Sequence, residues 1–174
     1  MEVSIITSDR LRVVTALTSL GGLCGVICGV IIIALALQGK EPRAQSRDQR
    51  HVIRPEKAPN TGLPFSPGIL VGNTLYVSGH LGRDPVTSRL VSGGIEAETR
   101  QVLANSLEVL KAAGMGLKDV TSVTAYITSF DDFAKFNTVY SEFFPTDPPA
   151  RATVQVAALN AGARIELQMI AVKP

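Results

Sequence analysis

The segments PPARATVQVA (residues 148–157) and RIELQMIAV (residues 164–172) decide how the fold of this chain is interpreted. Both alternate apolar and polar residues, which predicts two half-buried strands joined across a short Asn/Gly turn. In the second strand the apolar side chains share one face, and Glu166 and Gln168 share the other. The pattern therefore predicts a sheet with one face on a hydrophobic core.

Arg151 and Glu166 are the residues of this region that suggest chemistry. Arg151 stands where the loop enters the first strand, and an antiparallel pairing of the two strands would bring it to the same end of the sheet as Glu166. A fixed guanidinium beside a carboxylate can bind an anion and transfer a proton. The same two residues also fit an ordinary surface or interface ion pair.

The preceding sequence predicts an α+β domain. Further strands are expected at Ile69–Val71, Thr74–Ser78, Arg89–Ser92 and Val120–Thr128, the first two as a hairpin turning at Gly72-Asn73. One helix is expected from about Ile95 to Ala113, and a second is expected to be capped by Asp131 or Asp132 and to place an aromatic stripe in the core. Two helices on one face leave the other sheet face for a partner subunit to cover.

From Ala58 to Val172 the chain resembles the RidA/YjgF family of enamine/imine deaminases. The resemblance rests on the order and spacing of many short motifs, none of them specific alone. They are AP (58–59), PFS (64–66), VGNTLYVSG (71–79), DP (84–85), LVSGGI (90–95), TRQVL (99–103), LKAAG (110–114), FDDF (130–133), Asn137, Tyr140, FF (143–144), PAR (149–151), VQVA (154–157) and IE (165–166).

The resemblance implies a chorismate-mutase-like fold, with two helices on one face of a largely antiparallel mixed sheet. It also implies a homotrimer with ligand sites in the clefts between subunits. The implied activity is hydrolysis of 2-aminoacrylate-type enamines, through imines such as 2-iminopropanoate and 2-iminobutanoate, to 2-keto acids and ammonia. No metal or organic cofactor is expected to take part.

The resemblance also implies roles for individual residues. Arg151 would bind the substrate carboxylate through its paired donors. Glu166 would be the catalytic residue, positioning or activating the water that attacks the imine carbon. Gly79, beside Ser78, would let the backbone approach the substrate closely, and Thr153 would line the site near Arg151.

Other matching positions support or depart from the family pattern. Asn137 and Pro149 match positions with an architectural role. Phe65 stands in the site where Tyr is usual, so a hydroxyl is missing, and Asn160 replaces a usual Pro. His80, where Gln is common, fits either a pocket residue or an exposed loop histidine.

Two function classes are therefore kept: a membrane-tethered imine deaminase, or a catalytically silent trimer that binds a small carboxylate or a protein partner in the same clefts. Residues 58–174 contain 9 Lys or Arg against 10 Asp or Glu, a net charge of −1. A nucleic-acid-binding domain concentrates basic residues on its folded part, so nucleic acid is not expected as a partner.

The first 57 residues are a different kind of sequence. After a tail of residues 1–12, residues 13–37 hold no charge for 25 positions, enough for a transmembrane helix or uncleaved signal anchor. A polar linker is expected over residues 38–57. Its Lys and Arg residues place the domain on the cytoplasmic side. Ala34-Leu35-Ala36 leaves open the alternative of export with a cleaved signal peptide.

Both cysteines of the chain, Cys24 and Cys28, fall in this apolar run. One helical turn apart and without His or carboxylate neighbours, they predict neither a disulfide nor a metal site. Thiol chemistry in the domain that follows is excluded, because that domain contains no cysteine.

Overall fold

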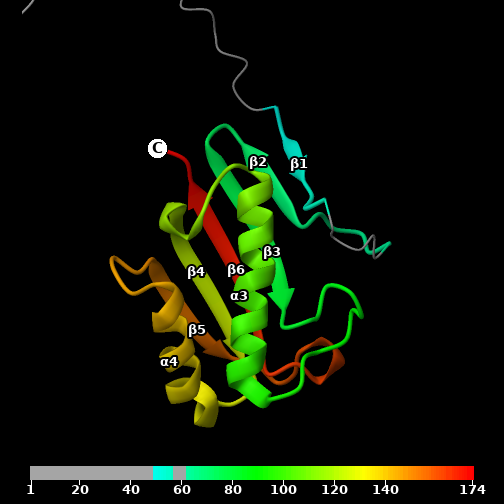
Figure 1. Ribbon diagram of the computed structural model, residues 1–174, viewed down its shortest axis with the longest axis vertical. Coiled ribbons are helices and arrows are strands. Elements are labelled where there is room, and N and C mark those ends of the chain that lie inside the picture. The colour runs from blue at the N-terminus through cyan, green and yellow to red at the C-terminus, as the bar shows by residue number, and fades with distance from the viewer. Residues whose placement is uncertain (1–48, 57–61) are drawn as a thin grey trace, which may run out of the picture. The chain divides into compact units, whose positions relative to one another are not determined.

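A six-stranded sheet with two helices on one face forms the region that the computed structural model describes, residues 49–56 and 62–174 (Figure 1). The strands are β1 (His51–Ile53), β2 (Gly68–Val71), β3 (Thr74–Leu81), β4 (Val120–Ile127), β5 (Ala150–Gln155) and β6 (Ile165–Val172). The helices are α3 (Gly94–Ala112) and α4 (Phe133–Phe143), with 3₁₀ turns η1 (Leu117–Asp119), η2 (Phe130–Asp132) and η3 (Asn160–Gly162).

The strand order is β1-β2-β3-β6-β4-β5, and β4–β5 is the one parallel pairing among these strands. The predicted α+β fold, with a largely antiparallel sheet and its helices on one face, is confirmed. The β2–β3 hairpin turns where predicted, and Gly72 adopts the positive φ of 59° that such a turn requires.

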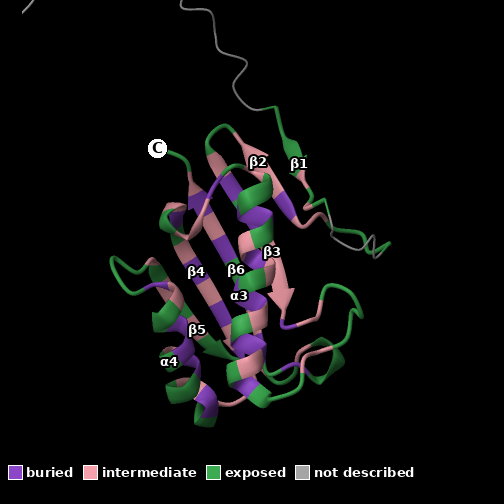
Figure 2. Cartoon of the chain, in the orientation of Figure 1, coloured by how far each residue is buried: buried purple, intermediate pink, exposed green. Residues whose placement is uncertain are grey.

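The core lies between the sheet and the helices. Burial alternates along the strands, so buried positions are interleaved with more exposed ones (Figure 2). In β6 the residues facing α3 and α4 are at most 1% exposed: Ile165, Leu167, Met169 and Ala171. Phe136 of α4 is fully buried with them in one cluster. Burying each such large side chain contributes about 1.5–3 kcal/mol, so this packing fixes which face of each strand points inward.

The opposite sheet face carries no helix of the described region (Figure 1). Val52, Ile69, Tyr76 and Ile170 stand in register across β1, β2, β3 and β6, and therefore form an apolar row on this open face. Tyr76 is 49% exposed and Val52 is 44% exposed, so both are among the exposed large hydrophobic residues of the described region. The row provides an apolar surface for another molecule to cover.

The predicted antiparallel pairing of the last two strands is wrong. β4 lies between β5 and β6, parallel to β5 and antiparallel to β6. The physical reason is the connection: α4 joins β4 to β5 and carries the chain back to the end where β4 began, so the two strands run the same way.

The strand expected at Arg89–Ser92 is also wrong, because the region forms a single bridge, Arg83–Leu90, outside the named strands. Local hydrogen bonds shape this loop. The Asp84 carboxylate accepts from the backbone N–H groups of Val86 and Thr87 and from the Thr87 hydroxyl. Asp side chains that bond to nearby backbone favour turns over ladder pairing.

The sheet begins earlier than the predicted domain boundary at Ala58. His51–Ile53, placed in the polar linker by composition, pairs with β2 as an edge strand. The expected membrane span, residues 13–37, lies outside the described residues, as do both cysteines. None of the helices in residues 49–56 and 62–174 is long and apolar enough to cross a bilayer.

Candidate functional site

Arg151 lies near the start of β5, half-buried, and points toward α4. Its register partner on β4 is Val123, which is buried on the helix-covered face. The guanidinium donates a 2.6 Å hydrogen bond from Nη2 to Oδ1 of Asn137 on α4. Among the described residues no carboxylate lies within ion-pair distance of Arg151. The cation is therefore held in place and keeps donors for an anionic ligand.

Two further predicted site residues share this side of the sheet. Thr153 pairs with the buried Ala125, so it lies on the helix-covered face two residues along β5 from Arg151. Pro149 is half-buried and stands directly before β5, where its fixed φ sets the entry of the strand. Arg151, Asn137 and Thr153 are thus brought together, and Pro149 supports them.

Glu166 lies on β6 with the opposite orientation, on the open face. It alternates with the buried Ile165 and Leu167, and it is half-buried. Burial raises the pKa of its carboxyl group above the ordinary value. None of the hydrogen bonds or ion pairs found in the described residues involves this carboxylate. A desolvated and unpaired carboxylate is suited to accept a proton from water.

Gly79 lies against Glu166. A Cβ added at Gly79 would overlap Oε1 of Glu166, so only glycine lets the carboxylate take this position. Gly79 falls where the β3–β6 register shifts between Val77 and His80. Such irregularities redirect side chains next to sites.

The residues around Gly79 are held by the β3 backbone and the segment before β2. The Ser78 hydroxyl donates to the Ser66 carbonyl oxygen at 2.6 Å, so this hydroxyl is already engaged. Phe65, in the same segment, is 52% exposed. Its ring is available to contact a ligand or another subunit.

His80 belongs to β3 and is half-buried, so its interpretation as an exposed loop histidine is wrong. Its Nε2 is buried with no hydrogen-bond partner in the described region. Burial lowers the pKa of His80, which favours the neutral ring.

Within one chain the structure does not bring Arg151 and Glu166 together. Arg151 points to the helix-covered face and Glu166 to the open face, so the predicted guanidinium beside a carboxylate is absent from the single chain. The interpretation as an intrachain ion pair fails for the same reason. A site that uses both groups has to combine two copies of the chain.

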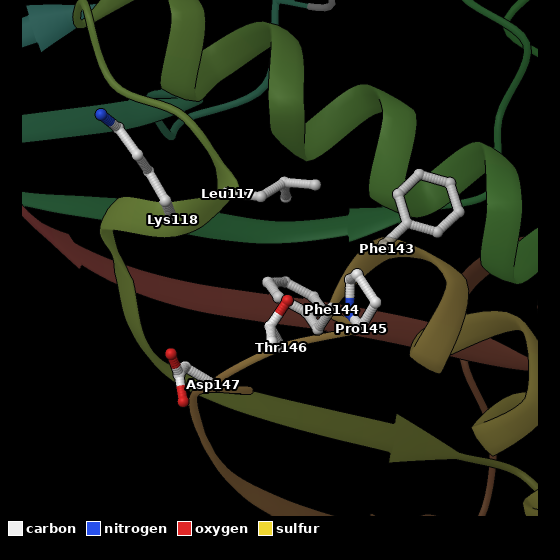
Figure 3. Close-up of a pocket in the computed structure, with 7 residues that line it drawn as sticks. All are labelled: Leu117, Lys118, Phe143, Phe144, Pro145, Thr146 and Asp147. Carbon is white, nitrogen blue, oxygen red and sulfur yellow. The ribbon is translucent and has the colours of Figure 1, made fainter.

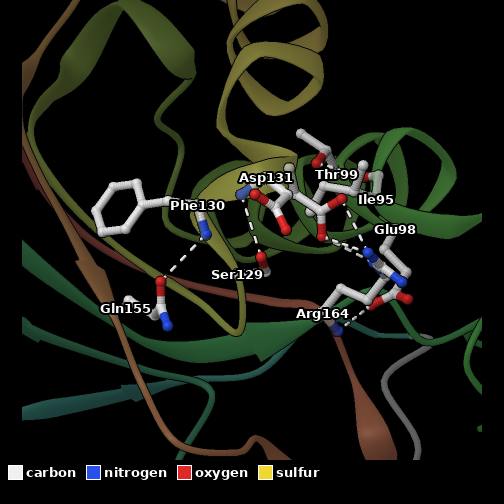
Figure 4. Close-up of polar contacts among 9 residues, drawn as sticks. Ile95, Glu98, Thr99, Ser129, Phe130, Asp131, Gln155 and Arg164 are labelled. Carbon is white, nitrogen blue, oxygen red and sulfur yellow. Dashed lines mark hydrogen bonds and ion pairs between the residues drawn. The ribbon is translucent and has the colours of Figure 1, made fainter.

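An ionic cluster that sequence reasoning missed, with buried carboxylates and a partly exposed arginine, links the helices to the start of β6 (Figure 4). Arg164 donates to both carboxylate oxygens of Asp132, at 2.8 and 2.9 Å, and its backbone N–H donates to Glu98 at 2.8 Å. Asp132 occupies the N-cap position of α4, as predicted, but its side chain makes no capping bond and pairs with Arg164 instead, while the Ser129 side chain caps η2. The cluster fixes β6 two residues before Glu166.

A shallow hollow of about 180 Å³ lies between η1 and the end of α4 (Figure 3). It is lined by Leu117, Lys118, Phe143, Phe144, Pro145, Thr146 and Asp147. It contains none of the predicted site residues, so it is separate from the candidate site. Among residues 49–56 and 62–174 no group of three His, Cys, Asp or Glu side chains is arranged to hold a metal ion.

Comparison with known proteins identifies the family. The profile of the family described as Endoribonuclease L-PSP matches residues 55–173. A 2-iminobutanoate/2-iminopropanoate deaminase from Homo sapiens is 43% identical over 124 residues, which cover 71% of this chain and 90% of the human protein. The crystal structure of RidA from the Antarctic bacterium Psychrobacter sp. PAMC 21119 is 39% identical, with a TM-score of 0.67, over 71% of this chain and 99% of that one.

The chain belongs to the RidA/YjgF family. The structure of E. coli TdcF with bound serine is also similar, at 31% identity and a TM-score of 0.67, over 71% of this chain and 99% of that one. The matched range of this RidA/YjgF chain contains all the predicted site residues, from Phe65 to Glu166. It leaves out β1, which extends the sheet before the match begins.

Proposed function

We propose that this protein hydrolyses 2-iminopropanoate, 2-iminobutanoate and related enamines to 2-keto acids and ammonia. The observation that carries the proposal is the Arg151 guanidinium, which is fixed by a neutral amide and paired with no carboxylate in the described region. Such a cation suits the carboxylate that all these substrates share. The name of the human relative and the serine bound to E. coli TdcF support a small carboxylate ligand.

The proposed chemistry needs one proton carrier. Glu166, whose raised pKa makes it a stronger base than an exposed carboxylate, takes a proton from water as the water oxygen bonds to the imine carbon. The substrate enters as the protonated imine, so this attack gives a neutral carbinolamine. Glu166 then returns its proton to the amine nitrogen. As the C–N bond breaks, Glu166 takes the proton of the new hydroxyl group, the keto acid and ammonia leave, and Glu166 passes that proton to water. Thr153, Ser78, Gly79 and Phe65 are proposed to surround the substrate.

Assembly into a homotrimer is part of the proposal. Arg151 and Glu166 lie on opposite sheet faces, so each complete site takes Arg151 from one copy and Glu166 from the next. The apolar row of Val52, Ile69, Tyr76 and Ile170 supports burial of the open face against another copy. Sedimentation equilibrium of the purified protein tests this, and a monomer at micromolar concentration contradicts it.

Tethering to a membrane is the other part. Residues 13–37 are proposed to anchor the protein, with the domain on the cytoplasmic side. The full-length protein should remain in the membrane pellet after alkaline carbonate washing. A mature chain beginning just after Ala36 would instead support export with a cleaved signal peptide.

The deciding experiment for function is steady hydrolysis of 2-iminopropanoate generated in situ. We expect the wild-type protein to release ammonia and pyruvate faster than the uncatalysed reaction. A protein that binds 2-oxobutanoate but shows no turnover would be a silent binder. Phe65 favours this second candidate, because a ring without a hydroxyl occupies the position of the usual Tyr.

A further inference from the structure

The Arg151 guanidinium rests on aromatic rings of α4. Its central carbon lies 4.5 Å from the ring centroid of Tyr140, 4.8 Å from that of Phe136 and 5.9 Å from that of Phe133. These residues recur at positions three, four and seven apart, so they share one helix face. All three distances are within the range of cation–π attraction. The face of an aromatic ring attracts the guanidinium but carries no net negative charge, so it does not neutralise the cation.

This support differs from that of two other arginines that contact α4 or its N-terminal cap. Arg164 pairs with Asp132, and Arg100 pairs with Glu142. Both of those guanidinium groups are matched to an acid. The Arg151 guanidinium contacts a neutral amide and aromatic rings instead of an acid. Its charge therefore stays uncompensated within the described part of the chain.

Tyr140 acts here through its ring. The residue is 5% exposed, and its hydroxyl is buried without a hydrogen-bond partner among the described residues. Burial raises the pKa of Tyr140 to about 12, although the nearby Arg151 charge opposes the shift. The phenol therefore stays neutral near pH 7 and does not provide an anionic partner for Arg151.

We propose that Tyr140, together with Phe136, is a positioning residue that holds the Arg151 guanidinium in one orientation without neutralising it. Asn137 completes this support by accepting one N–H bond. The remaining donors then face the carboxylate of a 2-imino or 2-keto acid. The inference rests on the proposed function, since it assigns the origin of carboxylate affinity at the same site.

Ring removal at Tyr140 in the full-length protein tests the inference. Tyr140→Leu should raise KM for 2-iminopropanoate, and Kd for 2-oxobutanoate, by about three- to thirtyfold, with little change in kcat. Tyr140→Phe keeps the ring and should retain wild-type KM. It should also raise Tm slightly, because it removes a buried hydroxyl that has no partner.

Phe144→Leu is the matched control. Phe144 is 7% exposed, and its ring centroid lies 4.7 Å from that of Tyr140, but no cation–π contact joins it to Arg151. It should lower Tm as Tyr140→Leu does and leave KM unchanged. Equal rises in KM for the two Leu variants would overturn the inference, as would a Tyr140→Phe variant as impaired as Tyr140→Leu.

A variant that introduces a charge at Asn137 tests whether the groups around Arg151 must be neutral, and it removes no side-chain volume from the core. Asn137→Asp keeps the shape and the acceptor, but it supplies an anion that competes with the ligand. Affinity for 2-oxobutanoate should fall by about ten- to a hundredfold. Unchanged affinity would contradict the inference even if Tyr140→Leu failed to fold. If Arg151→Ala leaves both ligand binding and turnover intact, the proposed function itself is wrong. If only the Tyr140 and Asn137 variants fail to behave as expected, the inference about the support of Arg151 is wrong and the proposed function stands.

Discussion

Arg151 and Glu166 occupy opposite faces of one sheet, and their surroundings differ in kind. Arg151 is held by Asn137 and by the rings of α4. Glu166 is desolvated beside Gly79 and receives no hydrogen bond from the described residues. The first environment fixes a charge in space, and the second raises the proton affinity of a carboxylate. The difference supports the proposal that Arg151 binds the substrate and that Glu166 transfers protons.

The largest expected effect is a loss of turnover when Glu166 is replaced, and it tests the role assigned to the open face. Glu166→Gln keeps shape and one acceptor but cannot take a proton from water, so kcat for 2-iminopropanoate should fall by about 10²–10⁴-fold. Binding of 2-oxobutanoate, measured by calorimetry, should survive. Full activity in this variant would make Glu166 structural.

A steric change at the same face comes next. Gly79→Ala places a methyl group where the Glu166 carboxylate lies, and displacing a reacting group by about 1 Å can cost on the order of 10²-fold in rate. Gly116→Ala is the control, because nothing lies within 4 Å of a Cβ at Gly116 and its φ is not positive. Similar rates for both variants would show that Gly79 does not set the carboxylate position.

Replacing Arg151 should change mainly the affinity for the ligand. Arg151→Ala should weaken binding of 2-oxobutanoate by about ten- to a hundredfold, because the ligand loses its charge-assisted contacts, and hydrolysis should be lost at low substrate. Calorimetry and initial rates measure the two effects. Arg89→Ala is a suitable control, since Arg89 is exposed in the loop before α3. Equal losses for both variants would contradict a specific role for Arg151.

Mixing the two inactive chains tests whether the faces meet between copies. In co-expressed Arg151→Ala and Glu166→Gln chains, an interface that combines one intact face from each restores a site. Activity should recover to about a quarter of wild type when the chains are equal in amount. If no activity recovers, either Arg151 and Glu166 act in a site within one chain, or one of the two takes no part in the reaction.

The smallest effect is on stability. Burial raises the pKa of Glu166 in the folded chain, so its stabilising contribution is present below the unfolded pKa and is lost as pH rises through the folded value. Glu166→Gln should therefore have a higher Tm than wild type at neutral pH, and the gap should close as the solution is acidified. A gap independent of pH would contradict the assigned cause.

Local pattern was sufficient for most elements. The alternation in residues 165–172 determined which face of β6 is buried, because side chains of a strand point alternately to its two faces. Helical spacing located α3 and α4 for a similar reason. The Arg89–Ser92 strand failed because Asp84 closes a local turn upstream of it, a competition that alternation alone does not show.

The relation between Arg151 and Glu166 was decided by tertiary structure alone. The sequence identified both residues, but strand order is not encoded in the alternation of either strand. The helix between β4 and β5 makes that pair parallel and leaves β4 between β5 and β6. The packing of β5 under α4 puts Arg151 on the helix-covered face, opposite to Glu166. The aromatic stripe was expected as core, and it is core. Only the packing of α4 on β5 places Tyr140 and Phe136 against the Arg151 cation, since cation–π contacts depend on where two elements meet.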